Sequence, residues 1–151
     1  MKRPRFYQKK LRKKGKFKRG FYIPINEDKY IQPSDKTMNQ GPHPEYRSSW
    51  ELAFYKYVDH QEDILFWSTE AQAIPYISPK DSQVHRYFPD VFIQKKNQNY
   101  IIEIKPKSQV LNPINQAKFA AAEEYCSRIN AIFLVITEVE LKAKGIICIE
   151  K

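Results

Sequence analysis

Apolar residues recur at helical spacing shortly after a polar stretch of the chain. The residues that return every three or four positions are Trp50, Ala53, Phe54, Tyr57 and Val58. This spacing places them on one face of a helix. Ser48 precedes them, and Glu51 follows Ser48 by three residues, which is the pattern of a capping box. The sequence therefore predicts a helix over roughly residues 48–60.

Short segments rich in β-branched and aromatic residues follow this helix, and they predict strands. We expect these strands at about 64–67, 71–77, 84–94 and 100–105. A turn is predicted at residues 96–99, where polar residues separate the last two of these strands. The middle of the chain is therefore expected to form most of a β-sheet.

The last third of the chain alternates between helical and strand patterns. Pro113 opens a predicted helix near 113–129, whose middle is rich in alanine. Residues 132–137 form an apolar run typical of a buried strand, and a short helical turn at 138–142 and a strand at 146–149 follow. The order α-β-β-β-β-α-β-β predicts an α/β fold in which helices flank a mixed sheet.

The length of the chain favours one domain with an additional tail. We expect residues 1–20 to be a basic arm without regular structure, residues 21–47 to be an irregular segment, and residues 48–151 to form the domain itself. The residues that disfavour regular structure in the segment are Pro24, Asn26, Pro33, Asn39, Gly41, Pro42 and Pro44. Its aromatic residues include Phe21, Tyr22, Tyr30 and Tyr46. These aromatic residues indicate that the segment packs over the domain.

Basic residues are concentrated at the N-terminus. Of the 26 Lys and Arg residues, eleven lie in residues 1–20 without any acidic residue, which leaves 15 against 17 acidic residues in the rest of the chain. Such an arm favours binding to the phosphates of nucleic acid. The residues that we expect to make this contact are Lys9, Lys10, Arg12, Lys13 and Lys14. The alternatives are a solvated terminus that only aids solubility and, less favoured, contact with an anionic membrane surface.

Other features of the sequence exclude several classes of protein. Cys126 and Cys148 have no metal-ligand spacing and fit a reduced, cytosolic setting. No apolar run approaches about 18 residues, and the N-terminus lacks the apolar region of a signal peptide. We therefore expect a protein that neither spans a membrane nor is secreted by that route.

Two acidic residues and a lysine fall on neighbouring predicted strands. Asp90 follows Phe-Pro near the end of one strand, and Glu103 and Lys105 lie two positions apart on the next. Alternation therefore places Glu103 and Lys105 on the same face. A two-residue turn at 96–97 would set Asp90 opposite Glu103, and a turn at 97–98 would set it opposite Lys105. Either register brings the three side chains together, because direct and diagonal neighbours are both within reach.

This combination is what metal-dependent cleavage of a phosphodiester bond requires. Asp90 and Glu103 can share one or two Mg²⁺ ions, for which Mn²⁺ is expected to substitute, and the Ile104 carbonyl can complete the shell. Lys105 can orient the attacking water or stabilise charge on the phosphate. Such cleavage would leave 5′-phosphate and 3′-hydroxyl ends. The alternative for these residues is an ordinary ion-pair ladder on a sheet surface.

Glu51 admits two interpretations. The predicted helix can present its carboxylate toward Asp90 as a third acidic group, which would bind the metal or orient water. As the third residue of a capping box, it can instead simply bond the Ser48 backbone N–H. Both interpretations can hold in different states of the protein.

Several further polar residues are candidates for contact with DNA, and they are Arg47, His85, Arg86, Lys107, Gln116 and Lys118. His85 is less suited to a metal, because no His or Cys partner has suitable spacing. Arg47 can either clamp a phosphate or be merely exposed. Trp50 and Trp67 are expected in the core.

The residues Glu51, Pro89-Asp90 and Glu103-Ile104-Lys105 resemble the PD-(D/E)xK nuclease superfamily, which implies a restriction-endonuclease-like fold. Longer segments are similar to the head-completion nucleases of contractile-tailed bacteriophages, and they are residues 20–24, 29–30, 46–51, 74–76, 85–90, 102–107 and 121–126. The resemblance covers roughly residues 20–137. A more distant resemblance is to the end-cleaving nuclease subunit of a bacterial transposase.

This resemblance implies a magnesium-dependent deoxyribonuclease that acts late in assembly of the phage head, at or near the packaged DNA end. It implies a location in the virion and the cytoplasm of the bacterial host, portal or neck proteins as partners, and a homodimer as a compatible state on DNA. One rival is a non-catalytic protein of the head or neck that binds the DNA end. A basic-tailed RNA-binding protein is the other, but it would need exposed aromatic residues, whereas Phe88, Phe92 and Phe133 occupy predicted core positions.

Overall fold

The computed structural model of the protein describes residues 19–33 and 42–148. Five residues that we predict to contact DNA, namely Lys9, Lys10, Arg12, Lys13 and Lys14, lie outside these ranges, as does most of the predicted arm. No helix in either range is long and apolar enough to cross a membrane.

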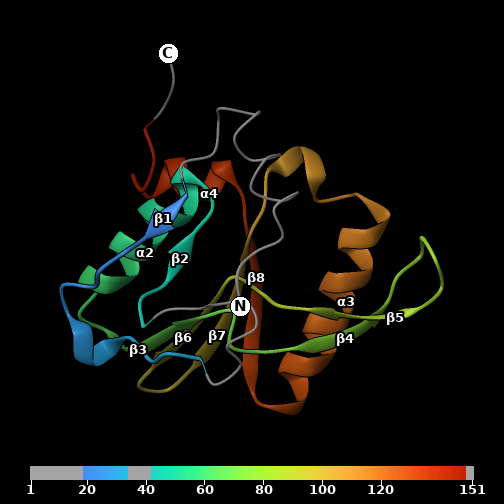
Figure 1. The fold of residues 1–151 in the computed structure, drawn as a ribbon, viewed down its shortest axis with the longest axis horizontal. Coiled ribbons are helices and arrows are strands. Elements are labelled where there is room, and N and C mark those ends of the chain that lie inside the picture. The colour runs from blue at the N-terminus through green and yellow to red at the C-terminus, as the bar shows by residue number, and fades with distance from the viewer. Residues whose placement is uncertain (1–18, 34–41, 149–151) are drawn as a thin grey trace.

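A four-stranded mixed sheet forms the centre of the protein (Figure 1). In spatial order its strands are β3 (Ile64–Thr69), β6 (Val91–Lys95), β7 (Asn99–Ile104) and β8 (Ala131–Ile136). The pairs β3–β6 and β6–β7 are antiparallel, whereas β7 and β8 are parallel. Helix α3 (Pro113–Arg128) makes the crossover that this parallel pairing needs.

The sheet lies between two helices (Figure 1). Helix α2 (Ser49–His60) buries Phe54, Tyr55 and Val58 in the main hydrophobic cluster, and α3 contacts the sheet through β8. The predictions of both helices and of a mixed sheet flanked by helices are therefore confirmed. Helix α2 begins as expected, because the Ser48 hydroxyl accepts a hydrogen bond of 3.1 Å from the Glu51 N–H.

The strand predicted over residues 84–94 is wrong in one respect, because it is two strands. β5 (Val84–Tyr87) pairs with β4 (Ile74–Ile77) in a separate hairpin, whereas β6 belongs to the central sheet. Pro89 lies between β5 and β6 and has no N–H with which to continue a ladder. The chain therefore changes sheets immediately before Asp90.

The strand predicted at 146–149 is absent over residues 146–148, and residue 149 lies outside the described ranges. Helix α4 (Glu138–Ala143) ends in a turn at Gly145, whose φ of 71° suits glycine. The N–H groups of Ile146 and Ile147 then bond the Leu141 carbonyl at 2.9 and 3.3 Å. The apolar pattern reflects packing of these two side chains against the core, not a strand.

Residues 19–33 and 42–47 pack over α2 and β3. They form the short pair β1 (Gly20–Phe21) and β2 (Glu45–Tyr46) and the 3-10 turn η1 (Glu27–Lys29). Tyr22 lies in the main cluster and donates a hydrogen bond of 2.5 Å to buried Asp59, which also accepts the Ile25 N–H at 2.7 Å. Tyr30 stacks edge-on against Trp67, with ring centroids 4.9 Å apart.

The aromatic residues placed in the core by the sequence divide into two groups. Trp67 is fully buried, whereas Trp50 is half-buried at the edge of the main cluster. Phe88, Phe92 and Phe133 are also half-buried rather than enclosed.

Candidate active site

Asp90 and Glu103 lie opposite each other on neighbouring strands. The Lys95 N–H bonds the Gln98 carbonyl at 2.9 Å, so the connection is the two-residue turn at 96–97. β6 and β7 pair Val91 with Ile102, and the same register extended by one residue opposes Asp90 and Glu103. Of the two turns that the sequence allowed, the structure has the one that sets the two carboxylates opposite each other.

The Asp90 carboxylate is held by the backbone of β7. Its Oδ2 accepts a hydrogen bond of 2.7 Å from the Ile104 N–H. This bond fixes the carboxylate against the strand that carries Glu103, and it leaves the other oxygen of Asp90 available to a ligand.

Both oxygens of the Glu103 carboxylate have partners. Tyr87 donates a hydrogen bond of 2.7 Å to Oε1, and the Lys105 Nζ lies 3.3 Å from Oε2. Glu103 is buried, whereas Lys105 is half-buried at the end of the strand. The lysine therefore connects an enclosed carboxylate to the surface of the protein.

Glu51 does not close the capping box. Its Oε1 accepts a hydrogen bond of 3.1 Å from the Arg47 N–H instead of the Ser48 N–H. The interpretation of Glu51 as a simple cap of Ser48 is therefore wrong for this state of the protein. Its charge acts on the site, because the repulsion between Glu51 and Asp90 contributes to the raised pKa of Asp90.

Glu70 is a fourth acidic residue at the site that the sequence did not reveal. It follows β3 with a φ of 51°, which is rare for a residue with a side chain, and it is buried. Its backbone N–H donates to the Asp90 carbonyl at 3.2 Å. The only signal in the sequence is that Ser68, Thr69 and Glu70 form a polar end to an apolar strand.

Arg47 points into the protein and neutralises part of this charge. Its Nη2 lies 2.9 Å from Glu70 Oε1 and 3.4 Å from Glu45 Oε1, and its side chain is only 17% exposed. The alternative in which Arg47 is merely exposed is wrong. A role as a phosphate clamp would require it to leave or share these carboxylates.

Burial and mutual repulsion disfavour ionised carboxylates here. The pKa of Asp90 is raised well above its usual range by burial first, and then by the charges of Glu103 and Glu51. Burial is also the main cause of the raised pKa of Glu51 and of Glu70, which Arg47 partly opposes. When all four are ionised, the carboxylates of Glu51, Glu70, Asp90 and Glu103 outnumber the nearby cations of Arg47, Lys105 and Lys118, so an added cation would favour their ionised forms.

Such a site suits a hard divalent cation. Asp90, Glu103 and the Ile104 carbonyl offer only oxygen ligands, which Mg²⁺ prefers. Within residues 19–33 and 42–148, no three His, Cys, Asp or Glu side chains are already gathered as a ligand set. The donor chemistry and the surplus of carboxylates fit the ion, and Glu51, whose Oε1 accepts the Arg47 N–H, is the further acidic residue that could join it.

Of the six further polar residues, Lys118 is the one that the structure brings to the site in addition to Arg47. Its Nζ lies 5.8 Å and 5.6 Å from the ring centroids of Tyr76 and Tyr87. Its pKa is lowered by burial first and then by the charge of Lys105. Tyr87 bonds Glu103, and the charges of Glu103 and Asp90 act on Lys118, so this lysine lies close to the carboxylate pair.

The other candidates lie around this centre. His85 is exposed and pairs with Asp81 at 2.8 Å, and the Arg86 guanidinium lies 5.3 Å from the centroid of the Phe88 ring. The exposed Lys107 and Gln116 flank the link between β7 and α3, where the Gln116 amide bonds the Val110 carbonyl at 2.6 Å. We call these four exposed residues the rim, to distinguish them from the residues that contact the acidic site.

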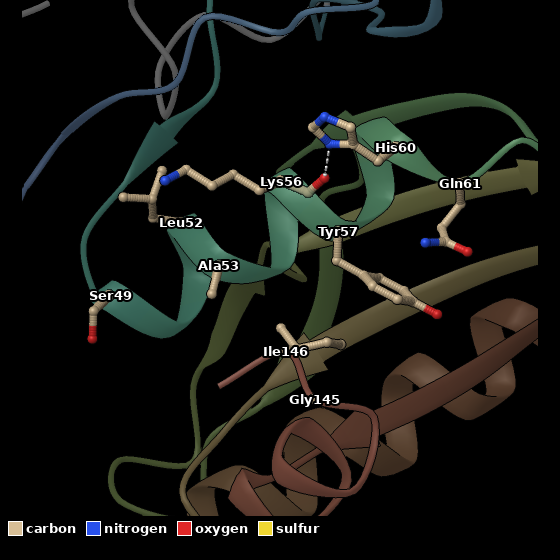
Figure 2. Close-up of a pocket in the computed structure, with 9 residues that line it drawn as sticks. All are labelled: Ser49, Leu52, Ala53, Lys56, Tyr57, His60, Gln61, Gly145 and Ile146. Carbon is tan, nitrogen blue, oxygen red and sulfur yellow. Dashed lines mark hydrogen bonds between the residues drawn. The ribbon is translucent and has the colours of Figure 1, made fainter. Parts of the chain in front are cut away.

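A cavity of about 530 Å³ lies on another side of α2 (Figure 2). It is lined by Ser49, Leu52, Ala53, Lys56, Tyr57, His60, Gln61, Gly145 and Ile146. No carboxylate lines it, and Figure 2 shows the His60 ring bonded to the Lys56 carbonyl at 2.7 Å. The cavity is thus separate from the acidic site.

Comparison with known proteins agrees with this geometry. Residues 61–138, just over half of the chain, match the family described as TnsA-like endonuclease N terminal, and the chain belongs to this family. The fold is accordingly restriction-endonuclease-like, as the sequence predicted. The matched region contains Glu70, Asp90, Glu103, Lys105 and Lys118, and Glu51 precedes it.

The chain is also similar to the head completion nuclease of Enterobacteria phage T4. It is 32% identical over 104 residues, which are 68% of this chain and 65% of the relative. The chain thus spans just under two thirds of the length of that relative. The predicted resemblance to phage head-completion nucleases is confirmed at the level of sequence.

Proposed function

We propose that this protein is a metal-dependent DNA endonuclease of phage head completion, which hydrolyses phosphodiester bonds at or near packaged DNA ends. The observation that carries the proposal is the pairing of Asp90 with Glu103 across two strands, with Lys105 at 3.3 Å from Glu103. Membership of an endonuclease family and the name of the phage relative support it.

In this proposal, Asp90, Glu103, the Ile104 carbonyl and Glu51 hold Mg²⁺ or Mn²⁺. The bound ion would lower the pKa of water and stabilise charge on the phosphate. The protein's own contribution is to fix the ligands before DNA arrives, through the bonds from the Ile104 N–H to Asp90 and from Tyr87 to Glu103.

Lys105 is the residue that we assign to the attacking water or the scissile phosphate. Its ammonium already lies beside Glu103 and is partly exposed, so it can turn to DNA without leaving the site. Water attack at phosphorus would yield the 5′-phosphate and 3′-hydroxyl ends.

The contacts that we propose with DNA come from the rim and from the basic arm. The rim residues are His85, Arg86, Lys107 and Gln116, and we propose that Arg47 and Lys118 contact DNA from within the site. We further propose that the protein acts in the virion and the host cytoplasm, beside portal or neck proteins, and that a homodimer can form on DNA. We propose residues 1–20 as the basic arm, 21–47 as the segment that packs on the core and 48–151 as the nuclease domain. The fold anchors the last two residues of the arm, since Arg19 pairs with Glu45 and Gly20 belongs to β1.

A second candidate is a protein that binds the DNA end without cutting it. The eleven basic residues in the first twenty positions favour this alternative, because such a segment can bind phosphate without any chemistry. The two functions differ in whether the carboxylate pair is needed.

The test is cleavage of supercoiled plasmid and of linear duplex with Mg²⁺, Mn²⁺ or EDTA. Asp90→Asn keeps an oxygen that can accept the Ile104 N–H but removes the charge, so cutting should be abolished while binding persists. The matched control is Asp63→Asn, since Asp63 is exposed and pairs with Lys95 away from the site. If DNA is bound and no metal or substrate form yields cutting, the end-binding function replaces the nuclease.

A further inference from the structure

The hairpin of β4 and β5 is seated on the domain by one face only. Because side chains alternate along a strand, Ile74 and Tyr87 point to the same side, where they are buried with Ala122 of α3. Figure 1 shows the hairpin crossing α3 and its tip extending beyond that helix. The hairpin is therefore fixed at its base and projects at its tip.

The opposite face of the hairpin carries an exposed apolar pair. Ile77 and Val84 are direct cross-strand partners, and they are 64% and 69% exposed. Their neighbours on the same face, Pro75 and Arg86, are exposed as well. Two β-branched side chains are thus held side by side in water at the end of a ribbon, which makes them a small apolar wedge.

The loop at the tip is built to hold this wedge in place. The Ser78 N–H bonds the Gln83 carbonyl at 2.9 Å, and the Ser82 N–H bonds the Ser78 carbonyl at 2.8 Å. Asp81 accepts the Gln83 N–H at 2.9 Å and pairs with His85 at 2.8 Å. A loop with these internal bonds has little conformational freedom left to lose on binding.

The hairpin leads directly into the candidate active site. At its base, Tyr87 donates to Glu103, and Asp90 follows three residues later. Val84 precedes Asp90 by six residues, which can span at most about 20 Å, or about six base pairs of duplex DNA. A duplex of about six base pairs is therefore long enough to contact both Val84 and Asp90.

Basic residues lie at the tip and at the base of the hairpin. Lys80 is exposed in the tip, and Arg86 lies on the outward face with Ile77 and Val84. Lys118 lies over the rings of Tyr76 and Tyr87 on the opposite face, which is turned toward α3. The one acidic residue of the hairpin, Asp81, is paired with His85. An apolar wedge between cations suits a polyanion that also offers apolar surface, and the major groove of duplex DNA admits a two-stranded ribbon.

We propose that the β4–β5 hairpin lies in a groove of duplex DNA within about six base pairs of the cleaved bond. Ile77 and Val84 contact the base edges, and Lys80 and Arg86 contact the flanking phosphates. This inference rests on the proposed function for the identity of DNA as the ligand, but it assigns two apolar residues that cleavage chemistry does not require.

The test is the affinity of the full-length protein for duplex DNA, measured by fluorescence anisotropy in EDTA at several salt concentrations. The variant is Ile77→Ser with Val84→Ser, and the matched control is Ile132→Ser with Leu134→Ser on β8, which are 41% and 40% exposed. EDTA prevents cleavage, so this experiment measures binding alone. If the protein never cuts DNA, the proposed function fails, but the role of the hairpin in binding is still tested.

We expect the hairpin variant to raise Kd by about tenfold at every salt concentration, and the control to stay within about twofold. Arg86→Ala should instead reduce the slope of log Kd against log salt by about one. The proposal is overturned by equal affinity of parent and hairpin variant, or by equal losses in both double variants. It is also overturned if sedimentation shows that the hairpin variant dissociates a parent oligomer, because the wedge would then be a contact between copies.

Discussion

The Arg47 guanidinium binds the Glu70 carboxylate at 2.9 Å in the candidate active site, and both side chains are largely enclosed. Arg47 shares this guanidinium with Glu45 at 3.4 Å, and Glu45 in turn binds Arg19 at 2.6 Å. A chain of alternating charges thus runs from the N-terminal segment to the carboxylates. Arg47 serves here as an internal counter-charge, which the sequence did not indicate.

Arg47→Met should lower the free energy of unfolding by about 3 kcal/mol, because it leaves two buried carboxylates without their shared cation. Urea unfolding at neutral pH measures the effect. The comparison is Arg128→Met, since Arg128 is exposed and 3.9 Å from Glu124, and it should change the midpoint little. Equal effects of the two substitutions would show that the buried ion pairs of Arg47 stabilise the protein no more than an exposed ion pair does.

Asp90→Asn should stabilise the metal-free protein at neutral pH by about 1 kcal/mol or more, since it removes a charge that its surroundings disfavour. Because the folded pKa of Asp90 is raised, its favourable contribution is present below the unfolded pKa and is lost as pH rises through the folded pKa. The gain of the variant should therefore shrink toward acid pH. Thermal unfolding in EDTA across pH measures this trend, and an unchanged or lower midpoint at neutral pH would contradict it.

Tyr87→Phe should weaken metal binding by about tenfold or more without unfolding the protein, because it removes the donor that orients Glu103. Isothermal titration with Mn²⁺ and rates of plasmid cutting are the measurements. Tyr125→Phe is the control, as Tyr125 packs against the same cluster as Tyr87. A loss of similar size in both variants would point to packing rather than to the hydrogen bond.

Lys105→Met should reduce single-turnover cleavage by about a hundredfold or more while DNA affinity changes little. Lys107→Met is matched to it, because Lys107 is an exposed lysine two residues further along. We expect the second substitution to weaken binding and to leave the rate at saturating protein nearly intact. Similar rates for the two variants would remove Lys105 from the chemistry.

The elements could be predicted where the local pattern determines them. The apolar stripe of α2, the proline that starts α3 and the polar residues between β6 and β7 each act over a few positions. Alternation predicted that Asp90, Glu103 and Lys105 lie close together, but it left open whether Glu103 or Lys105 lies opposite Asp90. The structure has Glu103 there, because the turn is at residues 96–97.

What could not be predicted depends on contacts between distant residues. Pro89 could be seen in the sequence, but the separation of β4 and β5 from the central sheet could not be predicted from it. That separation depends on the packing of Ile74 and Tyr87 against α3. Glu70 reaches the site only because the chain adopts a positive φ there, a conformation that its residue type disfavours. The pairing of Arg47 is set by the fold and carries no local signal.

The anchoring of residues 19–33 through Tyr22, Asp59 and Arg19 has a consequence for the eighteen residues that precede them. Lys9 precedes Arg19 by ten residues, and a chain of ten residues can span at most about 36 Å. A nucleic acid bound by the basic residues of this segment would be tethered to the domain. Its local concentration near the carboxylates would be in the millimolar range. Such a tether raises the frequency with which the carboxylates encounter DNA ends, without adding any contact at the site itself.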